Sequence, residues 1–174
     1  MDPIFLSEEI RKTHEEFISH ISELTNEELN TIPFAGSWTA GQVADHILKS
    51  TDGVPDNRTE QVSRPPDQQV EAIKTTFLDF TIKFQSPEFV IPAPGPFETD
   101  VIIAELERIK RQNLAIALTK DLSGLCTEFD FPGFGHLTRY EWLKFIVFHT
   151  QRHIHQLKQI KNALVNQSHA GAIK

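Results

Sequence analysis

The segment from His149 to His155, HTQRHIH, contains three of the eight histidines in this 174-residue chain. Imidazole is a common ligand of divalent transition metals, and two histidines at positions i and i+4 of a helix can reach one ion. Projected at about 100° per residue, His149 and His153 lie in the apolar stripe of the predicted helix. His155 points away from them. The spacing predicts that His149 and His153 face the core, where they can bind a metal.

The pair alone leaves a second interpretation open. A histidine that faces the core is more often hydrogen-bonded within the core than bound to a metal, and an HxxxH spacing can arise by chance among eight histidines. The segment also lacks the glutamate of the H-E-x-x-H motif, which serves as general base in zinc proteases. A zinc protease is therefore not indicated.

A third metal ligand must come from another helix. His46, in AGQVADHILKS, is the best candidate, and it lies on the flank of that helix's apolar stripe. His14 competes with it, although a hydrogen-bonded core or pocket histidine is the favoured interpretation there. His136 lies in a predicted loop and can approach or cover the site.

Other residues near these positions can assist a metal or a substrate. Asn113 falls in the apolar stripe of a long helix, and Gln156 lies about one turn beyond His153, so both can hydrogen-bond to a ligand or to substrate. Arg152, at the edge of the stripe, can meet an anionic substrate or simply face solvent. No general base is identified, and Asp130 or His136 could still supply one.

The aromatic residues Phe129, Phe131 and Phe134 either wall a pocket above the site or cap the core. Cys126 is expected to be buried and inert, because its surroundings supply no base and no cation to lower its pKa.

Helical periodicity dominates the chain, and strand-like alternation is nowhere convincing. We expect a first helix from an N-cap at Ser7 to Leu24 and a second from the capping box of Thr39 and Gln42 to about Ser50. Residues 51–67 are predicted as loop, and residues 86–98, with four prolines, as an extended connection. Further helices are expected at 67–84, 98–120 and 139–164, the last beginning at a Thr138–Glu141 capping box. The predicted fold is all-α, most simply an antiparallel four-helix bundle.

Composition limits the function classes. The length predicts a single domain, residues 1–174, with a real core. A net charge of −7 argues against binding to nucleic acid. One cysteine allows no internal disulfide, and neither a signal peptide nor a membrane-spanning run is recognised. A soluble, cytoplasmic protein without a membrane partner is expected.

The segments SWTAGQVADHILKS and FGHLTRYEWLKFIVFHTQRHIHQLKQI resemble the DinB-like, YfiT-like superfamily, and Trp38 resembles the tryptophan that marks one of its subfamilies. The resemblance implies a four-helix bundle in which His46, His149 and His153 hold one divalent ion. Zinc and nickel both suit imidazole. A homodimer is also implied.

Relatives in this superfamily include metal-dependent hydrolases and transferases that use low-molecular-weight thiols. The resemblance therefore implies a small-molecule substrate, and a thiol-dependent S-transferase acting on small electrophiles is the favoured activity. A metal-dependent hydrolase and a non-enzymatic protein that binds a metal or small ligand under stress are the alternatives. The missing general base disfavours hydrolysis, because a thiol, with a reference pKa of about 8.5, can ionise on a metal without a separate base.

Overall fold

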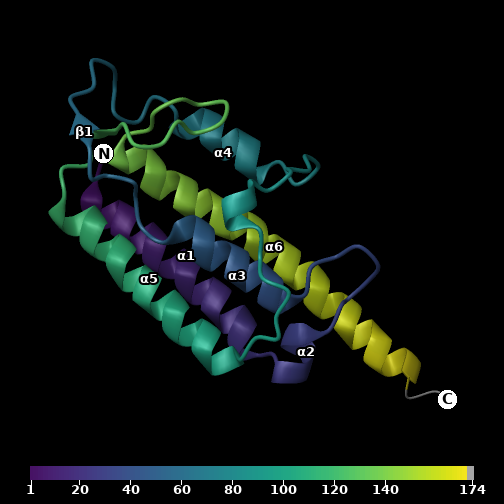
Figure 1. Cartoon of the computed structure of the whole chain (residues 1–174). Helices are drawn as coiled ribbons and strands as arrows, with labels where there is room; N and C mark the ends of the chain where they lie inside the picture. Colours follow the sequence, from purple (N-terminus) through teal and green to yellow (C-terminus); the bar gives the residue numbers. More distant parts are fainter. Residues whose placement is uncertain (172–174) are drawn as a thin grey trace.

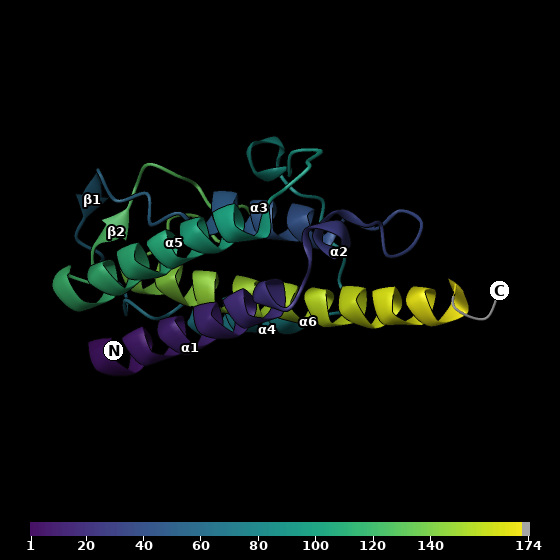
Figure 2. The ribbon, with the colours of Figure 1, turned by 90° about the horizontal axis from the view of Figure 1, so that it is seen from below.

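Four long helices pack side by side (Figures 1 and 2), namely α1 (Pro3–Ser22), α3 (Ala40–Thr51), α5 (Thr99–Thr119) and α6 (Arg139–Gly171). This computed structural model describes residues 1–171 and the side chains of residues 1–167. Helices α1 and α3 each contact both α5 and α6. The fold is mostly helical, as predicted. In the described part of the chain, no helix is long and apolar enough to cross a lipid bilayer.

The helices run in two directions. Lys110 pairs with Glu15 at 3.8 Å, and Thr99 bonds to Leu24, so α5 runs antiparallel to α1. In contrast, α6 runs parallel to α1, because Lys144 pairs with Glu9 and Lys158 with Glu16. Likewise α3 runs parallel to α5. The expected antiparallel arrangement therefore holds for the α1–α5, α3–α6 and α5–α6 contacts but not for α1–α6 or α3–α5, because the long 52–98 connection lets the chain return before α5 begins.

Local capping sets where the helices begin. The predicted start of the first helix at Ser7 is wrong: Asp2 is the N-cap, its Oδ1 accepting from the backbone N–H of Ile4 at 2.9 Å, and Pro3 occupies the first turn. The capping box of Thr39 and Gln42 is confirmed at the start of α3. The last helix extends beyond the predicted end near residue 164 to Gly171, because no proline or glycine interrupts it earlier.

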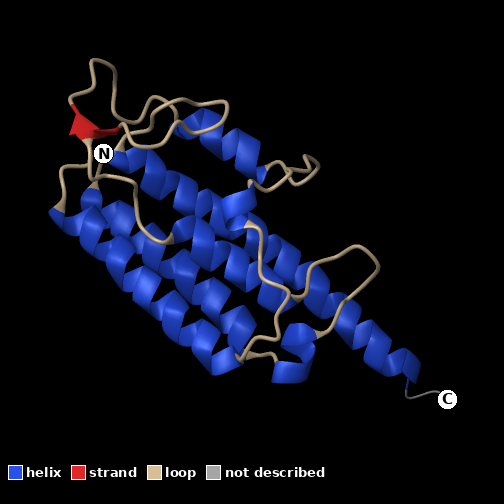
Figure 3. Ribbon diagram, viewed as in Figure 1, coloured by secondary structure: helices blue, strands red, loops and turns tan. Residues whose placement is uncertain are grey.

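The connections between the long helices contain short elements (Figure 3). Strands β1 (Thr59–Glu60) and β2 (Leu125–Cys126) form a two-stranded antiparallel sheet, in segments predicted to have no strand. Two-residue strands depend on pairing between distant segments and leave no alternation to detect. Helix α2 (Asn26–Asn30) follows α1, α4 (Val70–Leu78) is shorter than the predicted 67–84, and a 3₁₀ turn η1 (Glu88–Val90) interrupts the extended connection.

Buried apolar side chains form two clusters. One surrounds Ile10 and Phe145, and the other surrounds Phe17 and Leu157. Between them lie buried polar residues from three helices, His14 of α1, Asn113 of α5 and Thr150 of α6, which we call the polar layer. The metal-site candidates of α6 are at this same boundary, since the first cluster ends at Phe148 and the second begins at Ile154.

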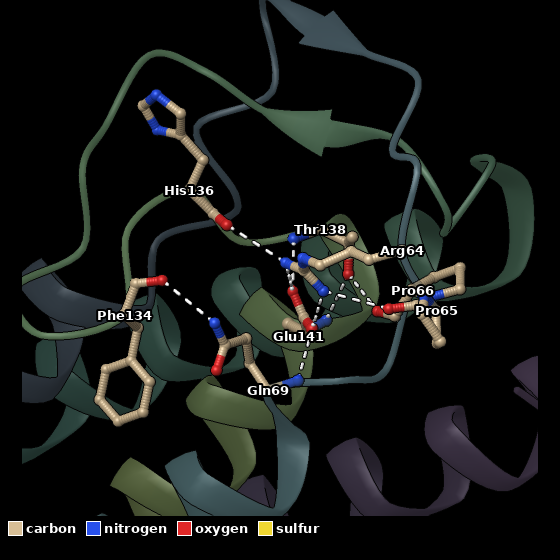
Figure 4. Close-up of polar contacts among 8 residues, drawn as sticks. All are labelled: Arg64, Pro65, Pro66, Gln69, Phe134, His136, Thr138 and Glu141. Atoms are coloured by element: carbon tan, nitrogen blue, oxygen red, sulfur yellow. Dashed lines mark hydrogen bonds and ion pairs between the residues drawn. The ribbon is translucent and has the colours of Figure 1, made fainter.

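A buried ion pair fixes the start of α6 (Figure 4). The Glu141 carboxylate, which is fully buried, accepts two hydrogen bonds from Arg64, at 2.6 and 2.7 Å. It also accepts from the backbone N–H groups of Gln69, at 2.8 Å, and Thr138, at 2.9 Å. Gln69 in turn donates to the backbone oxygen of Phe134. The pair therefore ties the 64–69 segment and the 134–138 loop to one helix end.

Candidate metal centre

Three histidines converge where α3 meets α6. The Nε2 atom of His149 lies 3.2 Å from Nε2 of His46 and 3.1 Å from Nε2 of His153. All three residues are buried, and each offers one nitrogen within 4.8 Å of the others. His149 and His153 are one turn apart on α6, whereas His46 comes from the antiparallel neighbour α3.

The other ring nitrogens fix the tautomers. His46 Nδ1 lies 2.8 Å from the carbonyl oxygen of Val90. His153 Nδ1 lies 2.8 Å from Oε1 of Gln156. Because carbonyl oxygens only accept, both Nδ1 atoms carry the proton, so both Nε2 atoms present lone pairs.

Ser50 completes this pattern for His149. The Ser50 hydroxyl donates to the backbone oxygen of His46 at 2.7 Å, so its oxygen can accept the Nδ1–H of His149, which lies 3.3 Å away. All three Nε2 lone pairs then face one another with no proton between them. Such an arrangement repels unless a cation lies among the nitrogens.

The spacing fits a bound ion. Two ligands at Zn–N distances of about 2.0–2.1 Å and tetrahedral angles lie about 3.3 Å apart. The two short nitrogen–nitrogen distances, 3.2 and 3.1 Å, are close to that value. The three buried histidines can therefore hold a metal ion.

Burial keeps these imidazoles neutral. Loss of solvation lowers the pKa of His149 well below its usual value, and the neighbouring His153 and His46 lower it further. Burial also lowers the pKa of His153 to about 3, and it lowers that of His46 against the opposing hydrogen bond to Val90. Neutral imidazole is the form that binds a metal, so no proton has to be displaced near neutral pH.

The three histidines line a cavity of about 1090 Å³ between α3, α4, α6 and the connecting segments. Six aromatic side chains form one side of it, and we call them the aromatic wall: Phe77, Phe129, Phe131, Phe134, Trp142 and Phe145. The ring of Phe145 stacks on that of His149 at 5.1 Å, so the wall adjoins the candidate metal centre directly.

Two predicted assisting residues lie in this cavity. Gln156 accepts the hydrogen bond from His153 described above. Arg152 donates to the backbone oxygens of Phe77, at 3.2 Å, and Asp79, at 2.8 Å, and also to that of Ile82. Its guanidinium lies 4.8 Å from the centre of the Phe84 ring. Arg152 therefore holds the segment after α4 over the cavity.

The other predicted residues lie elsewhere. Asn113 donates to the backbone oxygen of Thr51 at 3.0 Å, at the end of α3. His14 Nδ1 donates to Ile10 O at 2.9 Å in the core. His136 is exposed in its loop, its Nδ1 3.1 Å from Phe129 O, and neither it nor Asp130 is among the residues that line the cavity. His155, in contrast, does line the cavity, but it is not one of the three converging histidines, and its ring stacks on Phe80 at 4.2 Å.

Two contacts of the site were not predicted. Ser50 and the carbonyl of Val90 orient His149 and His46. Ser50 stands four residues after His46, on the same helix face, which was the available signal. The contact of His46 with the Val90 carbonyl could not be predicted from the sequence, because every residue type carries a backbone carbonyl.

The single cysteine lies outside the cavity lining. Cys126 is buried in β2, where loss of solvation raises the pKa of its thiol to about 12. It therefore remains a neutral thiol and does not supply the nucleophile.

Comparison with known proteins gives one family. The family model of the DinB superfamily matches residues 9–157, a range that contains all three histidines. The chain is also similar to the uncharacterized protein YuaE of Bacillus subtilis (strain 168), with 28% identity over 153 residues that cover 84% of this chain and 91% of that protein. No solved structure gives a significant match.

Proposed function

This chain belongs to the DinB superfamily, and we propose that it is a divalent-metal-dependent S-transferase of the four-helix-bundle type, which joins a low-molecular-weight thiol to a small electrophile. His46, His149 and His153 hold the ion, which is zinc or nickel. A cation at three neutral imidazoles lowers the pKa of a thiol or water that reaches it. The observation that carries the proposal is the convergence of three Nε2 lone pairs on the floor of a large cavity.

The residues of this chain bind and orient the reactants. In such a transfer the thiol sulfur forms a bond to an electrophilic carbon, the bond from that carbon to its leaving group breaks, and the thiol proton and the leaving group depart as an acid. The cavity holds both reactants beside the three histidines, and its aromatic wall excludes water from that side.

The cavity lining favours transfer over hydrolysis. Hydrolysis at such a centre needs a group that takes a proton from the attacking water. Asp52 is the only carboxylate among the described residues that line the cavity, and it is paired with Arg108 at 3.0 Å. Asp45, beside His46 in the sequence, accepts from the backbone of Ala93 and pairs with Lys49.

Turnover assays with single-histidine variants test the proposal. The protein, loaded with zinc or nickel, is assayed against a panel of thiols and electrophiles, and metal content is measured by elemental analysis. We expect about one ion per chain and thiol-dependent turnover, both lost in His149→Ala and His153→Ala and both retained in His155→Ala. Metal-dependent ester hydrolysis without thiol-dependent turnover contradicts the proposal.

A non-enzymatic metal- or ligand-binding role is the second candidate. The absence, among the described cavity-lining residues, of an unpaired carboxylate that could act as a general base favours this role over hydrolysis but not over thiol transfer. Retention of one ion per chain with no turnover for any thiol favours this role. The homodimer and the cytoplasmic location stay predictions.

A further inference from the structure

The aromatic wall forms a continuous surface beside His149. Phe77 and Phe145 contact the imidazole of His149, with ring centres 5.7 and 5.1 Å away. Phe131 extends this surface by contacting Phe145 at 4.7 Å and Trp142 at 5.2 Å. Two more rings continue the surface. Phe134 lies 5.8 Å from Phe131, and Phe129 lies 5.8 Å from Trp142, measured between ring centres.

Most of the charged side chains that line the cavity pair with other groups of the protein. Asp52 is paired with Arg108, and Lys49 with Asp45 and the carbonyl of Ile91. Arg152 is engaged by three backbone oxygens. Lys83, the remaining charged residue of the lining, is exposed on the loop after α4. A ligand on the wall therefore meets ring faces and edges, and Lys83, at the exposed side of the lining, is the described charged residue there for which no partner is seen.

We propose that the aromatic wall binds a flat, uncharged ring system, and that this is the electrophile of the transfer. The second part rests on the proposed function, whereas the binding itself does not. Flat rings can stack on, or contact edge-on, the rings that the wall exposes. The cavity is large enough to hold such a molecule and a thiol together, since ligand cavities typically span about 300–1,000 Å³.

Binding of a neutral fluorescent probe tests the wall without any metal or thiol. N-phenyl-1-naphthylamine is titrated into metal-free protein and into Phe131→Ala, Phe134→Ala and the volume-conserving Phe131→Leu. Phe5→Ala is the matched control, because Phe5 is exposed on α1 and outside the cavity lining. We expect Kd to rise tenfold or more in the two alanine variants, to rise less in Phe131→Leu, and to stay unchanged in Phe5→Ala.

The result separates this inference from the proposed function. Equal Kd for wild type and both alanine variants overturns the wall as a binding site, as does tighter binding of the sulfonated anionic analogue than of the neutral probe. Probe binding with the expected losses, in a protein that shows no thiol-dependent turnover, leaves the binding site standing and removes the transfer.

The polar layer behind the metal centre supports a second, independent inference. His14 Nε2, Asn113 Oδ1 and Thr150 Oγ are buried atoms without a hydrogen-bond partner. The three residues come from α1, α5 and α6, and each lies where its helix passes from one apolar cluster to the other. All three side chains are at most 1% exposed, which is costly for polar atoms unless something pairs with them.

The donors and acceptors match those of water. His14 Nδ1–H donates to Ile10 O, so His14 Nε2 is an acceptor. The Asn113 amide nitrogen donates to Thr51 O, so its Oδ1 is also an acceptor. The Thr150 hydroxyl can donate. We infer that internal water donates to His14 and to Asn113 and accepts from Thr150, because buried polar atoms are usually paired with protein or with ordered water.

A valine substitution distinguishes a bridged hydroxyl from an unpaired one. Thr150→Val removes the hydroxyl and nearly keeps the volume, so the melting temperature falls if the hydroxyl holds a water and rises if it was unpaired. A high-resolution crystal structure of the wild type should show density within hydrogen-bond distance of each of the three atoms. A raised melting temperature, or a core without that density, overturns the inference.

Discussion

Gln156 holds the imidazole of His153 on the side opposite the converging nitrogens. A partner that fixes the tautomer and ring angle of a metal ligand usually changes metal affinity by 10–100-fold when it is removed. We therefore expect Gln156→Leu to weaken zinc binding by about that factor. Competition with a fluorescent zinc chelator measures the change.

Gln159→Leu is the matched control for this residue. Gln159 lines the same cavity but lies beside His155, its Nε2 3.0 Å from that ring, and not beside a predicted ligand. Zinc affinity should be unchanged in this variant. Equal affinities in wild type and Gln156→Leu would show that the contact does not orient His153.

The reactivity of the Cys126 thiol tests whether this residue is buried in the folded protein. With a pKa of about 12, only about one molecule in ten thousand carries a thiolate at pH 8. Iodoacetamide should leave Cys126 unmodified in the folded protein and label it rapidly in urea, as mass spectrometry can follow. Fast labelling of the native protein would mean that the 125–126 strand opens readily.

At the scale of elements, the buried pair between Arg64 and Glu141 joins a long connection to the start of α6 (Figure 4). Glu141→Leu leaves the backbone N–H groups of Gln69 and Thr138 without their acceptor, and it leaves Arg64 with only the backbone oxygens of Pro65 and His136. We expect it to lower the free energy of unfolding by about 3 kcal/mol. Urea denaturation measures this change.

An exposed ion pair is the control for that experiment. Arg108 pairs with Asp52 at 3.0 Å, but both side chains are more than 40% exposed. Solvent screens such pairs, so Arg108→Ala should change the unfolding midpoint little. Similar losses in both variants would argue that the Arg64–Glu141 pair contributes no more than a surface contact.

The sequence predicts helices far better than it predicts how they are joined. Capping boxes located the starts of α3 and α6, because each depends on residues three positions apart. The predicted start of α1 is wrong because serine and aspartate both favour the N-cap position, so Ser7 and Asp2 are both candidates. Only the geometry shows that Asp2 accepts from the first backbone N–H groups. The β1–β2 sheet and the helix directions depend on contacts between distant segments, which no local pattern contains.

The same limit applies to the candidate site. Helical spacing brought His149 and His153 to one face and offered His46 and His14 as third ligands, and the family resemblance selected His46. His46, His149 and His153 converge in the structure. Ring orientation, in contrast, depends on Val90 and Ser50, and the aromatic wall depends on the path of the 129–134 loop. These features follow from the tertiary fold, so residue type and spacing could only suggest them.

At the scale of the whole molecule, a metal at the three histidines would link α3 to α6 and stabilise the folded state. A ligand that binds only the folded state adds about 4 kcal/mol when it is present at 1,000 times its Kd. For a domain of this size, that corresponds to a rise of roughly 10 °C in melting temperature.

Thermal unfolding with EDTA or with excess zinc checks this prediction. The rise should disappear in His153→Ala, which lacks one ligand, and persist in His155→Ala. A wild-type melting temperature that does not respond to zinc would contradict the metal centre itself.

The parallel course of α1 and α6 has a consequence for how fast the chain folds. The ion pairs between these helices join residues 135 and 142 positions apart, and His46 meets His149 across 103 positions. Chains that must close such long loops before their contacts form fold more slowly than bundles of sequence-adjacent helices. This protein should therefore refold more slowly than a simple up-and-down bundle of equal length. Its partly assembled helices would then expose their apolar faces for longer during synthesis.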